Sequence, residues 1–384
     1  MDEDVRQLVQ AVHNAPPRLV LVTAGAGTQA LSDLLGVAGA SRTVLEALVP
    51  YSEASFDEFL GQKPPQYVST ETAHFLAGRA FTRARWLESE NHPTVGLACT
   101  ATIVTDRPKR GEHRAHIAVW QKERLACITL HLQKGARDRQ GEESLVSRVI
   151  LNGLAQALGL EQQLALSLLP GDDLQADTSD FSHRAERLHQ EEIDCFGIEA
   201  NGRLLIPSEH PPVLLSGSFH PLHEGHLEMA RAAGELLGQP FGFELSAVNV
   251  DKPTLPPDMV LDRLAQFAGR YVVYASNAPT FVAKARLYEG TTFVVGYDTA
   301  VRILQPRYYQ DSEARMLAAL AEIRECHGRF LVAGRADDNG TFRHLEDIAI
   351  PAAVRDLFYP LPPDRFRRDI SSTELRAKGL RGSR

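Results

Sequence analysis

The amino-acid sequence predicts an α/β protein with two domains in succession, the second built on a mainly parallel sheet. Three observations lead to this fold class. The chain has 384 residues, which is more than one typical domain contains. Short apolar runs alternate with amphipathic helical patterns in both halves. Between the halves, residues 166–210 are polar, acidic and rich in turn residues. We therefore expect domains at 1–165 and 211–384, joined by a linker that carries some local structure.

The first half begins its α/β pattern with "RLVLVTAG", a short apolar run that ends in glycine and precedes a helical pattern. Strands are expected over residues 18–25, 94–104, 113–121 and 124–133. The longer helices are expected over 69–87 and 141–160. Ser69 and Thr70 stand at the start of the first of these helices, where a hydroxyl can cap the free backbone N–H groups.

The second half repeats the alternation more regularly. Strands are expected over residues 212–217, 241–250, 291–298 and 329–335, with helical patterns between them. Strands that alternate with helices form βαβ units and a mainly parallel sheet. Ligands bind such sheets beyond the carboxyl ends of the strands. Three polar stretches follow predicted strands at these ends: "SGSFHPLHEGH" (216–226), "NVDKP" (249–253) and "VGYD" (295–298).

Composition excludes several classes of protein. The formal net charge is −8, so no general attraction to nucleic acid or to an anionic membrane is expected. The four cysteines are far apart and form no CxxC pair, which argues against a disulfide scaffold and a cysteine zinc site. No apolar run approaches the ~20 residues that span a bilayer, and no signal peptide is visible. We expect a cytoplasmic protein without membrane or nucleic-acid partners.

Three histidines, His220, His223 and His226, follow the first strand of the second half at three-residue intervals. The last two stand in a loop and at a helix entrance, where free N–H groups and the helix dipole favour phosphate. Gly217 and Gly225 permit close backbone approach. The spacing H-E-G-H differs from the H-E-x-x-H of zinc helices, so no metal site is predicted. Histidines that only fill space or lie in solvent remain the alternative.

The same residues carry a family resemblance. "GSFHPLHEGH" resembles the G-x-F-x-P-x-H-x-G-H signature of the nucleotidyltransferase superfamily, and "ISSTELR" (370–376) resembles the I-S-S-T-x-x-R motif of its nicotinamide and nicotinate mononucleotide adenylyltransferases. The resemblance implies a Rossmann-like domain that binds ATP with Mg²⁺. It implies that His223 and His226 contact the α- and β-phosphates, with the nucleotide lying against Gly217, Ser218, Phe219 and Gly225.

The second motif implies a phosphate grip at the C-terminal end. By resemblance, Arg376 holds the β- and γ-phosphates together with Ser371, Ser372 and Thr373. Ser371 and Glu374 also match an S-x-x-E capping box, which any helix can use. That alternative explains the serine and the glutamate but not the threonine and the arginine.

Two further stretches match the superfamily less closely. "VVGYD" resembles its G-x-D segment, which implies that Gly296 and Asp298 lie beside the nucleotide. An aspartate that only caps a helix is the alternative. Lys252 follows the second strand, where the family commonly has a basic residue, and Arg263 can add positive charge near the phosphates. A solvated lysine is equally compatible with the sequence at position 252.

The reaction that this resemblance implies is adenylyl transfer. A phosphomonoester oxygen, most simply that of nicotinamide or nicotinate mononucleotide, attacks the α-phosphorus of ATP, and pyrophosphate leaves. His220 departs from the asparagine or aspartate that such enzymes more often carry, which puts the acceptor in question. A cytidylyltransferase, or an adenylyltransferase for another phosphorylated small molecule, is the alternative enzyme. A non-catalytic nucleotide-binding regulator is the alternative from another class.

The first half is similar to the C-terminal domain of CinA proteins, the nicotinamide mononucleotide deamidase family. The similarity lies in its strand–glycine turn and in "AGAS", "VPYS" and "VSTETA". The family's turn E-S-C-T-G-G corresponds here to residues 23–28, where Ala24 and Ala26 replace the serine and threonine. Phe56 stands at the family's lysine position. Amide hydrolysis needs a nucleophile or a base, and Ser52 and Ser55 are more simply turn residues. We expect an inactive domain that serves as scaffold, ligand sensor or homo-oligomer surface.

Overall fold

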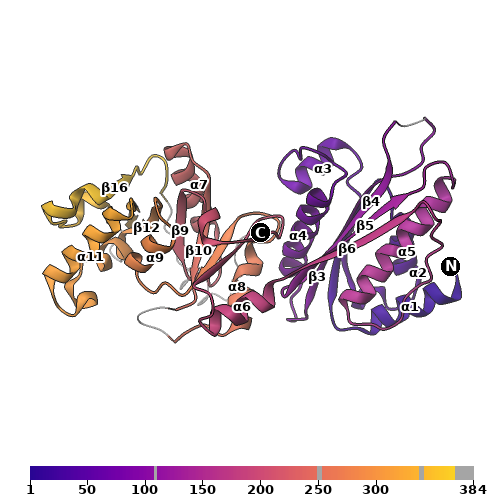
Figure 1. The fold of residues 1–384 in the computed structure, drawn as a ribbon, viewed down its shortest axis with the longest axis horizontal. Helices are drawn as coiled ribbons and strands as arrows, with labels where there is room; N and C mark the ends of the chain where they lie inside the picture. The colour runs from indigo at the N-terminus through magenta and orange to yellow at the C-terminus, as the bar shows by residue number, and fades with distance from the viewer. Residues whose placement is uncertain (108–109, 249–252, 337–340, 368–384) are drawn as a thin grey trace.

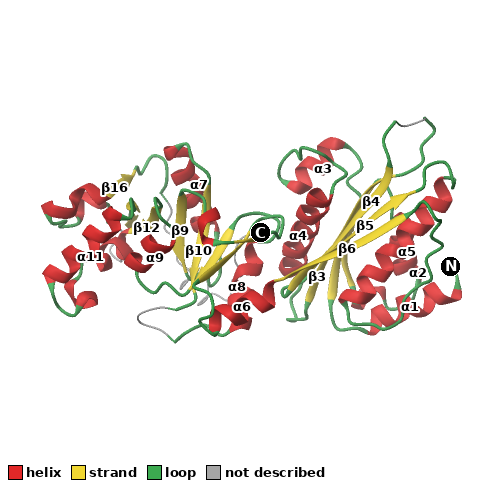
Figure 2. Cartoon of the chain, in the orientation of Figure 1, coloured by secondary structure: helices red, strands yellow, loops and turns green. Residues whose placement is uncertain are grey.

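The computed structural model describes residues 1–367, apart from 108–109, 249–252 and 337–340. These residues form two α/β units that lie next to each other along the long axis of the molecule (Figure 1). Each unit is organised around one large sheet with helices packed against it (Figure 2). The predicted fold class, an α/β domain followed by an α/β domain with a parallel-rich sheet, is confirmed.

The first sheet has six strands in the order β2-β1-β3-β4-β5-β6. Their bounds are Arg18–Ala24 (β1), Val44–Leu48 (β2), Thr94–Thr102 (β3), His113–Trp120 (β4), Arg124–Leu132 (β5) and Asp173–Asp180 (β6). The pairs that β1 makes with β2 and β3 are parallel, and the others are antiparallel. Leu19 and Leu21 belong to one apolar cluster, while Val20 and Val22 belong to another. Strand β1 is therefore buried on both faces, which explains its continuous apolar sequence.

Helices cover both faces of this sheet. They are α1 (Glu3–Asn14), α2 (Thr28–Gly36), α3 (Glu53–Leu60), α4 (Thr70–Leu87) and α5 (Arg139–Ala157). Helix α4 lies on the face turned toward the second unit, and α1, α2 and α5 lie on the opposite face (Figure 1). Ser69 caps α4 as predicted, because its hydroxyl accepts a hydrogen bond from the Thr72 N–H at 3.2 Å.

The second sheet has eight strands in the order β16-β13-β12-β9-β10-β11-β7-β8. Their bounds are Cys195–Ile198 (β7), Leu204–Leu205 (β8), Val213–Gly217 (β9), Phe241–Ser246 (β10), Val273–Ser276 (β11), Thr292–Gly296 (β12), Arg329–Ala333 (β13) and Phe358–Leu361 (β16). Strands β9 to β13 and β16 pair in parallel, and β7 and β8 pair antiparallel. The helices are α7 (Glu224–Leu237), α8 (Pro257–Leu264), α9 (Phe281–Leu287), α10 (Tyr297–Ile303) and α11 (Glu313–Glu325).

The segment predicted as a linker contains regular secondary structure. Residues 166–210 contain β6, which extends the first sheet, and α6 (Phe181–His189), β7 and β8, which belong to the second unit. Strand β6 pairs with β5 through its backbone, but nearly all its side chains are exposed. Such an edge strand has no alternation of apolar and polar residues, so the sequence pattern cannot reveal it.

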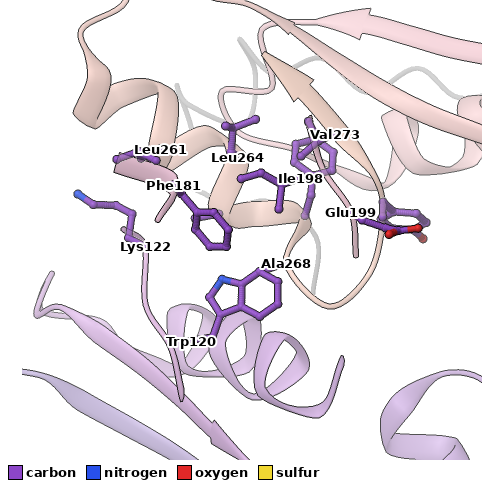
Figure 3. A pocket seen from close by; sticks show the side chains of 12 residues that line it. Trp120, Lys122, Phe181, Ile198, Glu199, Leu261, Leu264, Ala268 and Val273 are labelled. Carbon is purple, nitrogen blue, oxygen red and sulfur yellow. The ribbon is translucent and has the colours of Figure 1, made fainter. Parts of the chain in front are cut away.

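One apolar cluster crosses the junction between the two units. Trp120 of β4 lies beside Phe181 of α6, with ring centroids 5.8 Å apart, and Leu261 and Ala268 lie close by (Figure 3). The cavity that these side chains line has a volume of about 10 Å³, at the lower limit of what one water molecule needs. Around this cavity, the two units are therefore closely packed.

Two structural features agree with the composition. Cys99, Cys127, Cys195 and Cys326 are all free thiols. Among the described residues, the structure has no helix whose length and apolar character would let it cross a membrane.

Candidate functional site

The strand order of the second sheet reverses between β9 and β12. From β9 the chain continues to β10 and β11 on one side, and from β12 to β13 and β16 on the other. Strands β9 and β12 are parallel neighbours, with Leu214 opposite Phe293 and Leu215 opposite Val294. That register, continued, sets Gly217 opposite Gly296 at the carboxyl ends of the two strands. Such a reversal point is where open parallel sheets bind their ligands.

The loop after β9 is shaped by packing around Phe219. Its backbone has a φ of +42°, in the left-handed region that non-glycine residues rarely adopt. Its ring is 1% exposed and packs edge-to-face against Phe243 and Phe267. A Cβ at Gly217 would lie 2.9 Å from this ring, so a larger residue there would displace it. Ser218 and His220, on either side of Phe219, are exposed.

The structure brings His223 and His226 together at the start of α7. Their rings stack with centroids 3.7 Å apart, and the His223 N–H donates to Nδ1 of His226 at 3.3 Å. Because that Nδ1 is an acceptor, the proton of a neutral His226 sits on Nε2. Phe219 contacts the His226 ring edge-on at 5.2 Å. Gly225 is buried in the same first turn of α7.

Burial keeps both imidazoles neutral. Desolvation lowers the pKa of His223, and desolvation with the neighbouring His223 lowers the pKa of His226 to about 3. His223 is 6% exposed, and its Nδ1 has no hydrogen-bond partner among the described residues. A buried polar atom without a partner at a helix N-terminus is a reason to expect a ligand there. Together with the free amides of α7, the two rings form a donor-rich site for an anion.

Residues 218–223, the histidine loop, are held in place by two side chains of the next helical segment. The Gln266 amide donates to the Phe219 carbonyl at 2.9 Å and accepts from the Leu222 N–H at 2.8 Å. Arg263 donates to the Ser218 carbonyl at 3.1 Å, which gives it a role in the loop backbone that the sequence did not suggest. Gln266 was missed altogether. The one signal for it is a polar residue inside the apolar run "LAQFA".

Gly296 and Asp298 lie at the carboxyl end of β12, as expected. A Cβ at Gly296 would meet no atom within 4 Å, so the space beside it is open. Asp298 is in the first turn of α10 and does not cap it, because Gly296 is the N-cap residue. The Asp298 carboxylate instead forms an ion pair with Arg335 of the short strand β14 (Arg335–Ala336) at 2.5 Å. Arg335 is a second residue near this edge that the motifs did not indicate.

Several predicted residues lie outside the described part of the chain. These are Lys252 and the four residues of the C-terminal motif, Ser371, Ser372, Thr373 and Arg376.

In the first unit, donor groups at the end of the 23–28 turn are already hydrogen-bonded to a carboxylate of the same chain. Glu143 of α5 accepts hydrogen bonds from the Gly27 N–H at 3.0 Å, the Gln29 N–H at 3.0 Å and the Thr28 hydroxyl at 3.1 Å. An anion therefore already occupies the N-terminus of α2. No sequence pattern indicates this contact, because it joins residues more than a hundred positions apart.

The other candidate groups in this turn region are structural. Phe56 is 4% exposed and packs edge-to-face on Tyr67. Ser52 caps α3, because its hydroxyl accepts from the Ser55 N–H at 3.2 Å. The Ser52 hydroxyl is therefore used as a helix cap.

A groove of about 710 Å³ runs between the two units. Its wall on the second unit includes His220, Pro221 and Leu222, and its wall on the first unit includes α4 and the segment that follows it. Glu88, Glu90 and His92 in that segment are close enough to share a cation. Arg18 forms ion pairs with both carboxylates, at 3.4 and 2.9 Å, so the chain supplies that cation itself.

The fold and the histidine turn together define an α/β protein with a candidate anion site at the reversal point of a parallel sheet. No family model matches the chain. It is similar to a Schizosaccharomyces pombe protein described as "Putative nicotinamide mononucleotide adenylyltransferase", with 24% identity over 201 residues, which is 48% of this chain and 78% of that protein.

Solved structures of the CinA superfamily are also similar to part of the chain. The competence/damage inducible protein CihA of Agrobacterium tumefaciens shares 18% identity over 41% of this chain and 98% of its own, with a TM-score of 0.34. A CinA-superfamily protein of Escherichia coli shares 19% identity over 41% of this chain and 91% of its own, with a TM-score of 0.32. The relatives found by sequence and by structure bear the names of the two families that the motifs resemble.

Proposed function

We propose that the chain is an ATP-dependent nucleotidyltransferase that transfers AMP to a phosphomonoester of the nicotinamide or nicotinate mononucleotide type and releases pyrophosphate. The observation that carries this proposal is the pair of stacked, neutral imidazoles at the start of α7, beside the open carboxyl ends of β9 and β12. The curated relative supports the choice of acceptor, because its name specifies nicotinamide mononucleotide.

In the proposed reaction, a phosphate oxygen of the acceptor attacks the α-phosphorus of ATP. The bond from that phosphorus to the bridging oxygen breaks, and pyrophosphate leaves with the electron pair. No covalent enzyme intermediate is needed, since such transfers depend on positioning and charge stabilisation. Mg²⁺ enters with the nucleotide as part of the substrate and neutralises phosphate charge.

The histidine turn supplies the donors for this step. Nε2–H of His226 points a hydrogen bond at phosphoryl oxygens as their negative charge builds, and the first amides of α7 add to it. His223, whose Nδ1 lacks a protein partner, contributes a second imidazole from a position stacked on the first. We propose that Arg376 and its neighbouring hydroxyls hold the β- and γ-phosphates, and that Lys252 adds positive charge.

We infer that the first unit does not hydrolyse amides. Ala24 and Ala26 offer no nucleophile, and the helix end that could face an anionic substrate is occupied by Glu143. Incubation of the full chain with nicotinamide mononucleotide, without ATP, should release no ammonia above the uncatalysed rate. Enzyme-dependent ammonia would contradict this inference.

The central test is pyrophosphate release by the purified full chain. ATP and CTP are each supplied with nicotinamide mononucleotide, nicotinate mononucleotide, phosphopantetheine or glycerol 3-phosphate. We expect ATP with one of the two pyridine mononucleotides to give the largest kcat/KM. A preference for CTP or for another acceptor would replace the proposed substrates but keep the class. No turnover with any pair, in a protein that binds ATP, would favour a non-catalytic nucleotide-binding protein instead.

A further inference from the structure

Side chains of α8 and of the turn after it form hydrogen bonds to the backbone of the histidine loop. Gln266 joins the Phe219 carbonyl to the Leu222 N–H, and Arg263 holds the Ser218 carbonyl. The loop also borders the 710 Å³ groove through His220 and Leu222, and Gln266 lines the same groove. The position of His223, the next residue along the chain, therefore depends on where α8 and the 3₁₀ turn after it (Ala265–Phe267) are fixed.

Helix α8 is itself held by the first unit. The Arg85 guanidinium of α4 lies 2.8 Å from the Asp262 carboxylate, and Lys122 of the β4–β5 turn pairs with Asp258. Both acidic residues are on α8, and Arg263 directly follows Asp262. The two ion pairs thus attach the first unit to the same short helix that carries the loop contacts.

The backbones of the two units also meet directly beyond the end of that helix. A Cβ at Gly78 of α4 would lie 2.5 Å from the Gly269 amide nitrogen, and one at Gly269 would lie 2.3 Å from the Arg79 amide nitrogen. Distances below 3.0 Å to backbone atoms cannot be relieved by a rotamer change. The backbones of α4 and of the turn at residue 269 therefore approach this closely only because both positions are glycine.

We propose that the first unit is a positioning element for the histidine turn of the second. Arg85 and Lys122 fix α8, and Gln266 and Arg263 transmit that position to the backbone of residues 218–222 and so to His223. In this chain of contacts, Arg85, Asp262 and Gln266 act as positioning residues. The inference rests on the proposed function, in that the histidine turn is taken as the site of nucleotidyl transfer.

The test compares two ion pairs on the same helix. Arg85→Ala breaks the pair with Asp262 across the junction, whereas Arg83→Ala breaks the pair with Glu46 inside the first unit, at 2.8 Å. Both variants lose one α4 arginine, so Arg83→Ala is a matched control for stability. We expect Arg85→Ala to lower kcat by about 3- to 10-fold with little change in KM for ATP, since small displacements of catalytic groups cost rate. Arg83→Ala should retain the wild-type kcat.

Two further variants separate positioning from simple loss of stability. The charge-reversed pair Arg85→Asp with Asp262→Arg should recover most of the kcat that either single change removes. Gln266→Ala should lower kcat by about 10-fold or more, because both of its hydrogen bonds to the loop are lost. Equal kcat in Arg85→Ala and wild type, or equal losses in Arg85→Ala and Arg83→Ala, would overturn the proposal.

A readout without substrate keeps this proposal distinct from the proposed function. Histidine ¹⁵N NMR titration of the full chain follows the imidazoles of His223 and His226 directly. A displaced loop admits water, so Arg85→Ala and Gln266→Ala should shift the titration of these two histidines, while Arg83→Ala should not. If wild-type protein shows no transfer but these shifts occur, the coupling stands and the assigned reaction fails. If transfer occurs and no variant changes the titration or kcat, the coupling fails alone.

Discussion

At the scale of single residues, the chemistry of the candidate site depends on two imidazoles that stay neutral. A protonated pair could not stack at 3.7 Å without strong repulsion. Burial prevents protonation, and the hydrogen bond from the His223 N–H selects the Nε2–H tautomer of His226. The donor that His226 can offer to a ligand is thus defined by the backbone of α7 rather than by pH.

His226→Ala removes that donor. We expect kcat to fall by about 10²-fold, the usual cost of one preorganised donor to a developing charge, with a smaller change in KM for ATP. Steady-state pyrophosphate assays measure both values. The exposed His189 on α6 provides the control, and His189→Ala should behave as wild type. Near-normal turnover in His226→Ala would remove this residue from the site.

The same histidine makes stability depend on pH. The pKa of His226 is about 3 in the folded protein and 6.5 in the unfolded chain. Between these two pH values, the unfolded chain therefore binds more protons than the folded protein. Its contribution to the free energy of unfolding is complete above pH 6.5 and is lost as the pH falls toward 3. In urea titrations from pH 7.5 to 4, His226→Gln should therefore lose less stability than wild type. Parallel curves for the two proteins would show that His226 does not titrate in this way.

At the scale of elements, the sequence predicted the parts that carry their own periodic signal. Strands β1, β3, β4, β5, β9, β12 and β13 and helices α4, α5, α7 and α11 fall where the patterns placed them. Strand β6 has no apolar alternation, and β11 and α9 are too short to show a period. The positions of Gly217, His223, Gly296 and Asp298 at strand ends followed from the βαβ pattern, whereas the pairing of β9 with β12 is seen only in the structure.

Contacts between distant elements could not be predicted in this way. Gln266, Arg335 and Glu143 each act on a segment more than thirty positions away. A single sequence contains no signal for such pairs, because each side chain is compatible with many exposed positions. The motifs therefore identified the histidine turn but not the groups that hold it.

Glu143→Ala tests the filled helix end of the first unit. The change removes the acceptor of two backbone N–H groups and two hydroxyls, and we expect a loss of about 1–3 kcal/mol in the free energy of unfolding. Gln140→Ala, at an exposed position of the same helix, controls for the change in α5. Denaturant titration measures both. Nucleotidyl transfer should be unaffected below the melting temperature, and equal stabilities of the two variants would show that the Glu143 contacts contribute nothing.

At the scale of the whole molecule, the two units share a core rather than a flexible connection. Trp120, Phe181 and Leu261 belong to one buried cluster that continues from the first sheet into the second unit. Most inter-domain contacts are small and polar, and they permit independent motion. A shared apolar cluster predicts instead that the units unfold together.

Calorimetry of Gly78→Val examines that cooperativity. Wild-type protein should show a single thermal transition, because loss of either unit exposes the shared cluster. In the variant, the new side chain meets the Gly269 backbone within 2.5 Å, and neither helix α4 nor the turn at residue 269 can move without opening the junction. We expect two separated transitions, with the nucleotidyltransferase rate reduced as in Arg85→Ala. Gly111→Ala, at a position with no atom within 4 Å of the new methyl group, should keep the single transition. If the wild type already shows two transitions, the junction does not couple the unfolding of the two units, even though their backbones approach each other closely.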